Sequence, residues 1–255
     1  MLVFIVPLKS KTVSKSWTRV SNLFERTARS ICSQTVDDFR LIVVCNELPE
    51  TEFIHPNMEF MNVNIFPIES THEWINRGRE DDKARRIMAG MDKAIEYNPS
   101  FVMVVDADDC IRNNLVEYVL SQPTDKGWYV ASGYIYKLGS RWLYKKRNEF
   151  QIVCGSSLIL RPEDVSKVIT HDAHGHCYHH QSLPSKLIPL DPLPFPGAIY
   201  TVLNRENHHM TTNKLSTIKA VKPGTRLKIF ARRIRNYRLS VLTHATRQLF
   251  GLYSI

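Results

Sequence analysis

The pattern of hydrophobic and polar positions predicts alternating strands and helices along the first 115 residues. Short continuous apolar runs are typical of buried strands, whereas apolar residues that recur every three or four positions indicate helices. The expected strands cover 2–7, 39–45, 58–67 and 101–105, and the expected helices cover 16–33 and the stretch from Asp81 to just before Asn98. This order predicts an α/β fold, with a mixed, mainly parallel sheet flanked by helices and joined by right-handed crossovers.

The second half of the chain has a less regular pattern. A short helix is expected over 115–120, and strands are expected over 128–136, 150–160 and 198–203. Prolines at 189, 192, 194 and 196 predict an extended connector over 184–197. Beyond Pro223, apolar residues repeat at helical intervals with Lys and Arg between them, which predicts an amphipathic helix over 225–250.

The net charge of +9 is concentrated at the end of the chain. No acidic residue follows Glu206, whereas ten basic residues do, so the body is close to neutral and the tail is cationic. A cationic, amphipathic helix over 225–250 fits a surface-lying anchor on anionic lipid. It fits equally well a helix that docks on the body with a solvated basic face, and both interpretations stay open.

Composition favours a cytoplasmic protein. The chain has 255 residues, 43% of them hydrophobic, which is enough for one large α/β domain or two small ones. No apolar stretch approaches the roughly 20 residues of a membrane span, and the start lacks the basic leader of a signal peptide. The five cysteines are scattered and form no Cys-x-x-Cys pair, which argues against a disulfide framework or a zinc ribbon. We expect a cytoplasmic location, with peripheral contact at the inner face of the membrane if the tail binds lipid.

A cluster of aspartates is the strongest chemical signal in the sequence. Asp106-Ala107-Asp108-Asp109 directly follows the apolar run 101–105, so it is expected at the carboxyl edge of the sheet, where open α/β folds bind ligands. Carboxylate oxygens at such an edge suit Mg²⁺ or Mn²⁺. The alternative is structural: Asp106 would end the strand and Asp109 would cap a helix that begins near Asn113.

The order and spacing of these motifs resemble the nucleotide-binding half of GT-A (Rossmann-like) glycosyltransferases, most closely the family 2 type. The matching segments are the strand that ends at Pro7, Ser33-Gln34-Thr35 after the first helix, the strand 39–44, Lys83-Ala84-Arg85 in the next helix and the run 101–109. The resemblance implies a GT-A catalytic domain over 1–210, with a nucleotide-binding half at 1–115 and an acceptor half at 116–210. Residues 211–255 would form a basic C-terminal helical extension.

The resemblance also implies a function and a set of site residues. It implies metal-dependent transfer of a sugar from a UDP- or GDP-linked nucleotide-sugar donor to a hydroxyl of a glycan or lipid-linked acceptor, as in cell-surface polysaccharide or glycolipid synthesis. The residues carried over are Pro7 and Asn46 or Glu47 at the base and ribose, Lys83 and Arg85 at the substrate edge, Asp106 at ribose and metal, and Asp108 and His208 at the metal. Cys45-Asn46-Glu47 departs from the acidic and Gly-Ser pattern usual after the second strand, which leaves the base undetermined.

The resemblance implies that the acceptor-site base lies between the strand that ends at Leu160 and His208, where Asp172 and five histidines fall within residues 171–180. An inverting transferase needs a group that accepts the proton of the acceptor hydroxyl, and Asp172 and His176 are our candidates. Density of histidine also raises a zinc hypothesis, but the spacing fits no familiar ligand pattern, and an exposed polar loop is the structural alternative. Gly155-Ser156-Ser157 predicts a close backbone approach within a strand, either as the floor of an acceptor pocket or as a simple bulge.

Physical chemistry supports the same reaction. Cleavage of a sugar nucleotide places negative charge on the departing diphosphate, and a divalent cation held by carboxylates stabilises that charge by about several kcal/mol. A sugar nucleotidyltransferase would keep the carboxylates but typically needs a glycine-rich basic loop after the first strand, and residues 8–11 contain no glycine. A nucleic-acid-binding module built on the cationic tail is the third hypothesis, and the neutral body fits it poorly.

Overall fold

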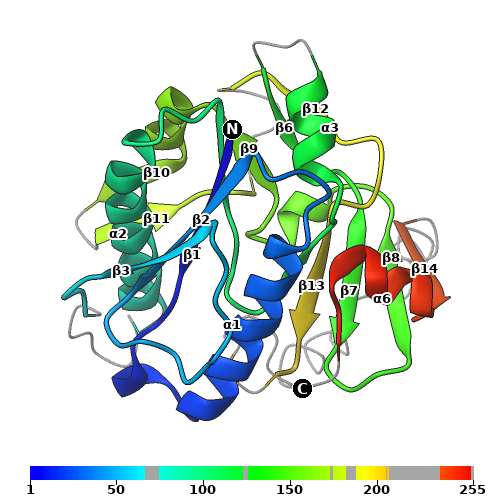
Figure 1. The fold of residues 1–255 in the computed structure, drawn as a ribbon, viewed down its shortest axis with the longest axis horizontal. Helices are drawn as coiled ribbons and strands as arrows, with labels where there is room; N and C mark the ends of the chain where they lie inside the picture. Colours follow the sequence, from blue (N-terminus) through cyan, green and yellow to red (C-terminus); the bar gives the residue numbers. More distant parts are fainter. Residues whose placement is uncertain are drawn as a thin grey trace, which may run out of the picture.

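The computed structural model describes residues 1–66, 75–122, 126–172, 175–181, 188–204, 206 and 236–253. A mixed seven-stranded sheet with helices on both faces forms the larger part of the fold, and a five-stranded sheet packs beside it (Figure 1). The predicted fold class, an α/β protein with a large, mainly parallel sheet flanked by helices, is confirmed.

Strand β1 lies near the centre of the large sheet, between β4 and β2, and each of these pairs with it in parallel. Beyond β2, β3 continues the parallel arrangement, whereas β9 pairs antiparallel with β4 on the other side. The strands, in sheet order, are β12 (Leu190–Pro192), β6 (Gly127–Tyr129), β9 (Leu158–Leu160), β4 (Phe101–Val104), β1 (Leu2–Pro7), β2 (Phe39–Cys45) and β3 (Met58–Asn62).

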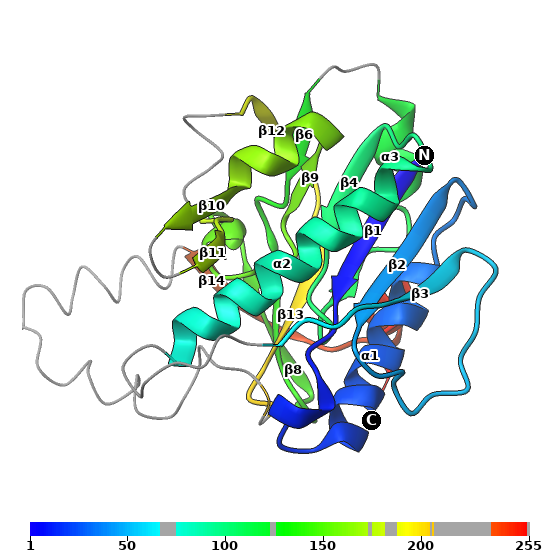
Figure 2. The ribbon, with the colours of Figure 1, turned by 90° about the vertical axis from the view of Figure 1, so that its left-hand side faces the viewer.

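Helices α1 (Trp17–Cys32) and α2 (Ile75–Ile95) cover opposite faces of this sheet (Figure 2). The side chains of β1 alternate between the two faces: Leu2, Phe4 and Val6 pack in the core that includes α1, and Val3 and Ile5 pack in the core that includes α2. Because both faces of β1 are buried, its sequence is a continuous apolar run rather than an alternating one.

The smaller sheet lies to the right of α1 in Figure 1. Its order is β14 (Tyr237–Val241), β8 (Trp142–Lys146), β7 (Gly133–Lys137), β13 (Ala198–Val202) and β5 (Cys110–Ile111). Helix α3 (Leu115–Ser121) packs its buried face in the α1 core, and α6 (His244–Phe250) packs Phe250 against the smaller sheet. A hairpin of β10 (Ile169–Asp172) and β11 (Gly175–Tyr178) completes the described strands, with short 3₁₀ turns at Lys11–Val13, Phe150–Ile152 and Pro162–Val168.

The structure confirms the predicted strands at 2–7, 39–45 and 101–105 and the predicted helix at 16–33, each within one residue. Helix α2 begins at Ile75, earlier than the predicted start at Asp81. Asp81 and Asp82 therefore lie inside the helix, where they pair with Arg85 and Arg86 one turn later instead of marking its first turn.

Three other predictions of secondary structure are wrong. The expected strand 128–136 is divided between β6 and β7. The expected strand 150–160 is a 3₁₀ turn and the short β9, because Glu149 adopts a left-handed conformation (φ 59°) and turns the chain before Phe150 packs onto Gly133. The helix expected over 225–250 is not continuous: Tyr237–Val241 is a strand that pairs with the open edge of β8. Residues 207–235 lie outside the described part of the chain, and none of the described helices is long and apolar enough to cross a membrane.

Candidate active site

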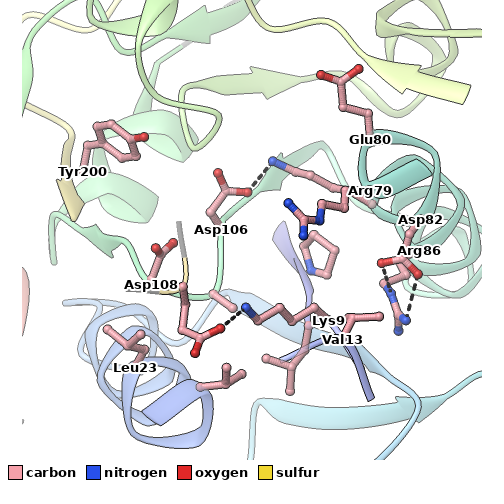
Figure 3. Close-up of a pocket in the computed structure, with 16 residues that line it drawn as sticks. Lys9, Val13, Leu23, Arg79, Glu80, Asp82, Arg86, Asp106, Asp108 and Tyr200 are labelled. Atoms are coloured by element: carbon pink, nitrogen blue, oxygen red, sulfur yellow. Dashed lines mark hydrogen bonds and ion pairs between the residues drawn. The ribbon is translucent and has the colours of Figure 1, made fainter. Parts of the chain in front are cut away.

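A pocket of about 240 Å³ opens at the carboxyl ends of β1 and β4, between α1 and α2 (Figure 3). One part of its wall is apolar, formed by Leu8, Val13, Val20 and Leu23. The rest of its wall carries the charged residues Lys9, Arg79, Glu80, Asp82, Lys83, Arg86, Asp106, Asp108 and Glu206, together with Pro7, Ala107 and Tyr200. An apolar pocket with a group of convergent charges is the usual form of a small-molecule site.

Asp106 enters this pocket directly from β4. Its backbone N–H donates to the hydroxyl of Ser156 at 2.8 Å, and its carbonyl accepts from the N–H of Asp109 at 3.0 Å, so a tight turn follows the strand. Its carboxylate forms an ion pair with the ammonium of Lys83 on α2. The turn thus presents Asp106 and Asp108 on the same side, towards the pocket.

Asp108 is held by residues that follow β13. The Nδ2 of Asn204 donates to Oδ2 of Asp108 at 2.6 Å, and the Oδ1 of Asn204 accepts from the backbone N–H of Glu206 at 2.9 Å. Because a backbone N–H can only donate, the orientation of the Asn204 amide is fixed, and its N–H group must face Asp108. Leu203, just before Asn204, has a left-handed backbone (φ 56°), a strained conformation for leucine that turns the chain at this point.

Crowding of negative charge alters the acidity of these groups. Burial, followed by the neighbouring carboxylate of Asp106, raises the pKa of Asp108 to about 6, although the Asn204 hydrogen bond opposes the shift. Burial also lowers the pKa of Lys83, but the attraction of Asp106 and its neighbours outweighs this effect, and the net pKa is raised. Lys83 therefore stays protonated as a counter-charge to the aspartates.

Asp109 does not line the pocket, and it does not cap a helix. Its fully buried carboxylate accepts hydrogen bonds from the N–H of Thr201 at 3.0 Å and the hydroxyl of Ser156 at 2.7 Å. The residue at the N-cap of α3 is Asn114, so the helix-capping interpretation of Asp109 is wrong. Burial, and then the charges of Asp108 and Asp106, raise the pKa of Asp109 well above its usual value. This carboxyl is structural.

Gly155 allows the chain before β9 to pass very close to the site. A Cβ atom at this position would lie 2.8 Å from Oδ2 of Asp106 and 3.0 Å from Nζ of Lys83. The predicted close approach of Gly155-Ser156-Ser157 is therefore present, although it occurs in the turn before β9 rather than within a strand. Its partner is the Asp106–Lys83 pair, and Ser156 bonds to both Asp106 and Asp109.

The donor set fits Mg²⁺ or Mn²⁺ shared with a substrate better than it fits a metal held by protein alone. In the described part of the chain, no three His, Cys, Asp or Glu side chains are arranged to hold an ion. Mg²⁺ commonly uses one or two carboxylates and completes its shell with substrate phosphates and water. Asp106 and Asp108 can supply those carboxylates, whereas a structural zinc site needs four protein ligands.

Comparisons with known proteins identify no family. No protein-family profile matches the sequence, and no curated protein matches it. Among solved structures, the chain is similar to that in "Crystal structure of S. aureus TarS", with 12% identity and a TM-score of 0.39. The match covers 79% of this chain and 36% of the other, so this chain spans about a third of that protein's length. So distant a likeness carries no functional argument, and function rests on the site.

Four of the predicted site residues meet in the pocket: Pro7, Lys83, Asp106 and Asp108. They come from three elements that are far apart in the sequence: the shared carboxyl edge of β1 and β4 brings Pro7 and the aspartates together, and α2 carries Lys83 to Asp106. His208 lies outside the described residues, so its role as a third metal ligand stays a prediction.

Three predicted donor-site residues have other surroundings. The Glu47 carboxylate accepts from the Ser10 hydroxyl and the Lys11 N–H, each at 3.0 Å, and so fixes the loop after β1. The Arg85 guanidinium donates to Asp81 at 2.7 Å and to the carbonyl of Phe66. The Asn46 side-chain amide is buried, and within the described residues neither its nitrogen nor its oxygen has a hydrogen-bond partner. None of the three is among the residues that line the pocket.

The candidate bases lie on the β10–β11 hairpin, which packs against α2. The backbone N–H of His176 donates to Oδ1 of Asp81 at 2.8 Å, and its Nδ1 lies 3.0 Å from the same oxygen. The backbone of Asp172 pairs with Gly175 across the hairpin. His176 contacts α2 and is not among the residues that line the pocket, so the assignment of a base stays a prediction.

Several residues of the site were not predicted from the sequence. Lys9, Arg79 and Tyr200 line the pocket, and Asn204 and Glu206 fix Asp108 and the chain around it. Burial, with the nearby aspartates, raises the pKa of the Tyr200 phenol, which therefore stays a hydroxyl. The one available signal for these residues was the polar segment that follows the predicted strand 198–203. From the sequence, His208 of that segment is predicted as the metal ligand, and Asn204 is not identified.

Proposed function

We propose that the protein is a metal-dependent glycosyltransferase that transfers a sugar from a nucleoside diphosphate donor, UDP- or GDP-linked, to a hydroxyl acceptor. The observation that supports this most strongly is that Asp106, paired with Lys83, and Asp108 lie in one pocket with further cationic side chains at the carboxyl edge of the sheet. Carboxylates that hold a divalent cation, next to lysine and arginine, suit a diphosphate better than they suit an uncharged ligand.

In this proposal, Asp106 and Asp108 are the residues that would hold Mg²⁺ or Mn²⁺, and the bound cation would supply Lewis-acid stabilisation of a diphosphate leaving group. Lys83 is kept protonated by Asp106, and from its place in the pocket wall it would contribute positive charge to a bound diphosphate. Lys9 and Arg79 add positive charge on the pocket wall. Preorganised cations of this kind stabilise charge as it develops in the transition state.

The rest of the chain positions these groups. Asn204 fixes the carboxylate of Asp108 through a single oriented hydrogen bond, which leaves the other carboxylate oxygen available to a cation. The apolar wall of Leu8, Val13, Val20 and Leu23 offers packing for the uncharged part of the donor and keeps water from that side. Asp172 and His176 remain our candidates for the base that accepts the acceptor proton. We propose a hydroxyl of a glycan or of a lipid-linked molecule as the acceptor.

Thermal shift and donor hydrolysis test this function. We expect UDP- or GDP-sugars to raise the melting temperature only when Mn²⁺ or Mg²⁺ is present, because a cation held by Asp106 and Asp108 would supply the positive charge that the diphosphate needs. A donor at about 100 times its Kd would add about 2.7 kcal/mol to the free energy of unfolding. Asp108→Asn should abolish both the shift and the metal-dependent release of nucleoside diphosphate.

The matched control is Asp92→Asn, which changes an exposed aspartate on the solvent side of α2. It should keep the full response. Stabilisation by donor without metal, or an unchanged response in Asp108→Asn, would contradict the proposal. Stabilisation by nucleic acid alone, lost at high salt, would favour nucleic-acid binding instead.

A further inference from the structure

An exposed apolar patch covers two strands of the smaller sheet. Trp142 and Tyr144 of β8 and Leu239 and Val241 of β14 are 49%, 51%, 52% and 52% exposed. Single exposed apolar residues are ordinary on protein surfaces, whereas a contiguous group indicates an interaction site. We call these four residues the β8–β14 patch, and both strands lie at the right-hand edge of Figure 1.

The strand register makes the four side chains contiguous. Leu239 pairs with Tyr144, and Val241 pairs with Trp142. Residues paired across an antiparallel ladder project from the same face, and residues two apart along a strand share that face. The patch is therefore a two-by-two block of large side chains. Leu143, which lies between Trp142 and Tyr144, points to the other face and is fully buried with α6.

Positive charge surrounds the patch. Residues 133–147 and 236–255 contain no aspartate or glutamate. The side chains of Arg141 and Arg147, on either side of β8, and of Lys137, at the end of the neighbouring β7, are exposed around the patch, whereas Arg238 pairs with Lys145 and projects from the opposite face. A cationic rim around apolar and aromatic side chains is the composition of surfaces that bind anionic lipid: the rings and aliphatic groups enter the interface, and the cations contact acidic head groups.

The patch also shares a sheet face with the pocket. Leu239 pairs with Tyr144, Tyr144 with Ile135, and Ile135 with Tyr200, so one row of side chains crosses four strands. Tyr200 lines the pocket. With neighbouring strands about 4.8 Å apart, this row spans about 14 Å. A surface bound at the patch would lie close to the pocket and on the same side of the sheet.

We propose that the β8–β14 patch docks the protein on a lipid bilayer that carries anionic head groups. Its aliphatic pair, Leu239 and Val241, suits acyl chains and offers no stacking face to a sugar or a nucleobase. A second copy of the chain would bring two identical cationic rims together, which repel each other. The docking surface is a strand pair, which differs from the amphipathic helix that the sequence predicted over 225–250.

Vesicle flotation tests the docking surface, and because it needs neither metal nor sugar nucleotide, its result is independent of the proposed reaction. We expect the full chain to float with vesicles of phosphatidylcholine and phosphatidylglycerol in about a three to one ratio, and to bind pure phosphatidylcholine at least roughly tenfold more weakly. Raising NaCl from about 0.05 to 0.5 M should release most of the protein, because salt screens the cations of the rim.

Two variants separate the apolar and the cationic contributions. Trp142→Thr with Leu239→Thr should weaken binding to the anionic vesicles by roughly tenfold or more, because it removes two large exposed apolar groups that would enter the lipid. Arg141→Glu with Arg147→Glu changes only exposed charges and should have a similar effect. The matched control, Leu48→Thr with Ile54→Thr, removes side chains that are 62% and 84% exposed elsewhere on the molecule, and it should bind as the unchanged chain does.

Several outcomes would overturn the proposal. It fails if the unchanged chain does not float, or if both patch variants float as well as the control. It also fails if the control variant loses as much binding as the Trp142 and Leu239 variant. If the chain binds no vesicles but forms a dimer as its concentration rises, and Trp142→Thr with Leu239→Thr prevents that dimer, the patch would be assigned to a second copy of the chain.

Discussion

At the scale of single residues, three aspartates within four positions have three different environments. Asp106 pairs with Lys83, Asp108 accepts from Asn204, and Asp109 is buried among hydrogen-bond donors. Side-chain type alone predicted a carboxylate cluster, but it could not separate these roles, because each depends on a partner that lies far away in the sequence. The partner of Asp108 is 96 residues away.

The raised pKa of Asp108 leads to a prediction about pH. Because that pKa is about 6 in the metal-free protein, the carboxyl is protonated below this pH and cannot bind a cation. Protons and Mn²⁺ therefore compete, and we expect the Mn²⁺ affinity to be constant above pH about 7 and to fall by up to tenfold per unit below about 6. Titration calorimetry with MnCl₂ alone, at several pH values, measures this.

The comparison for this titration is Asp108→Asn, which has no proton to lose at that position. Its Mn²⁺ affinity should be weak throughout, without the change near pH 6. A wild-type affinity that stays level from pH about 5 to 8 would show that Asp108 is not a ligand.

At the scale of elements, α2 approaches the central sheet through a glycine. A Cβ atom on Gly90 would lie 2.6 Å from Cγ2 of Ile5 and 3.0 Å from Cγ2 of Val44. Both atoms belong to buried, β-branched side chains on neighbouring strands, which have little freedom to move. Because Gly90 has no side chain, α2 can pack close to β1 and β2. This close packing also determines the position of Lys83, which lies on the same helix.

Gly90→Val should therefore destabilise the fold. Overpacking of a core in this way typically costs about 1–3 kcal/mol in the free energy of unfolding, and a β-branched residue gives little helix propensity in return. Urea denaturation followed by circular dichroism measures the change. Asp92→Ala, on the exposed side of the same helix, should stay within about 0.5 kcal/mol of the unchanged protein. Equal stability of the two variants would contradict the close contact.

The elements that the sequence predicted well are those whose pattern reflects burial directly. Strand β1 is buried on both faces and reads as an apolar run, and α1 buries one stripe, with residues such as Val20, Phe24 and Ile31 at helical spacing. The prediction for Tyr237–Val241 was wrong because the apolar residues of this segment also fit a helical period. Pairing with β8 decided its conformation, and no local pattern reveals an open strand edge in another part of the chain.

At the scale of the whole molecule, Glu206 joins the two sheets. Its carboxylate accepts from the backbone N–H groups of Lys15 and Ser16, at 3.3 and 3.1 Å, and pairs with the ammonium of Lys9. Lys9 follows β1 of the larger sheet, whereas Glu206 follows β13 of the smaller one. One buried carboxylate therefore fixes the chain just before α1 and ties it to Lys9 and to the segment that follows β13.

Glu206→Ala should lower the free energy of unfolding by about 1–3 kcal/mol, since it leaves two backbone donors and one ammonium without their acceptor. Glu206→Gln should recover part of this loss, because an amide oxygen can still accept from the backbone. Thermal and urea unfolding measure both variants. Glu52→Ala, at an exposed position, is the control and should change little. A loss in Glu206→Ala no larger than in the control would contradict the role of Glu206 as a tether.

The part of the site that could be predicted is the part built on one sheet edge. Parallel strands end together, so Pro7 at the end of β1 and Asp106 after β4 were expected to be neighbours, and both line the pocket. The contributions of Asn204 and Glu206 depend on how the smaller sheet docks. That docking arises from contacts between distant segments, and neither periodicity nor spacing along the chain encodes it.

Asp109 illustrates how this docking bears on experiments. Its carboxylate accepts from Thr201 in one sheet and from Ser156 beside the other, directly behind the two aspartates that face the pocket. Asp109→Ala would remove the acceptor that links the two sheets, and we expect Asp106 and Asp108 to shift from their positions as a result. An alanine scan that measures only turnover would rank all three aspartates alike. A melting curve recorded with each assay would distinguish Asp106 and Asp108, which act in the pocket, from Asp109, which supports the fold.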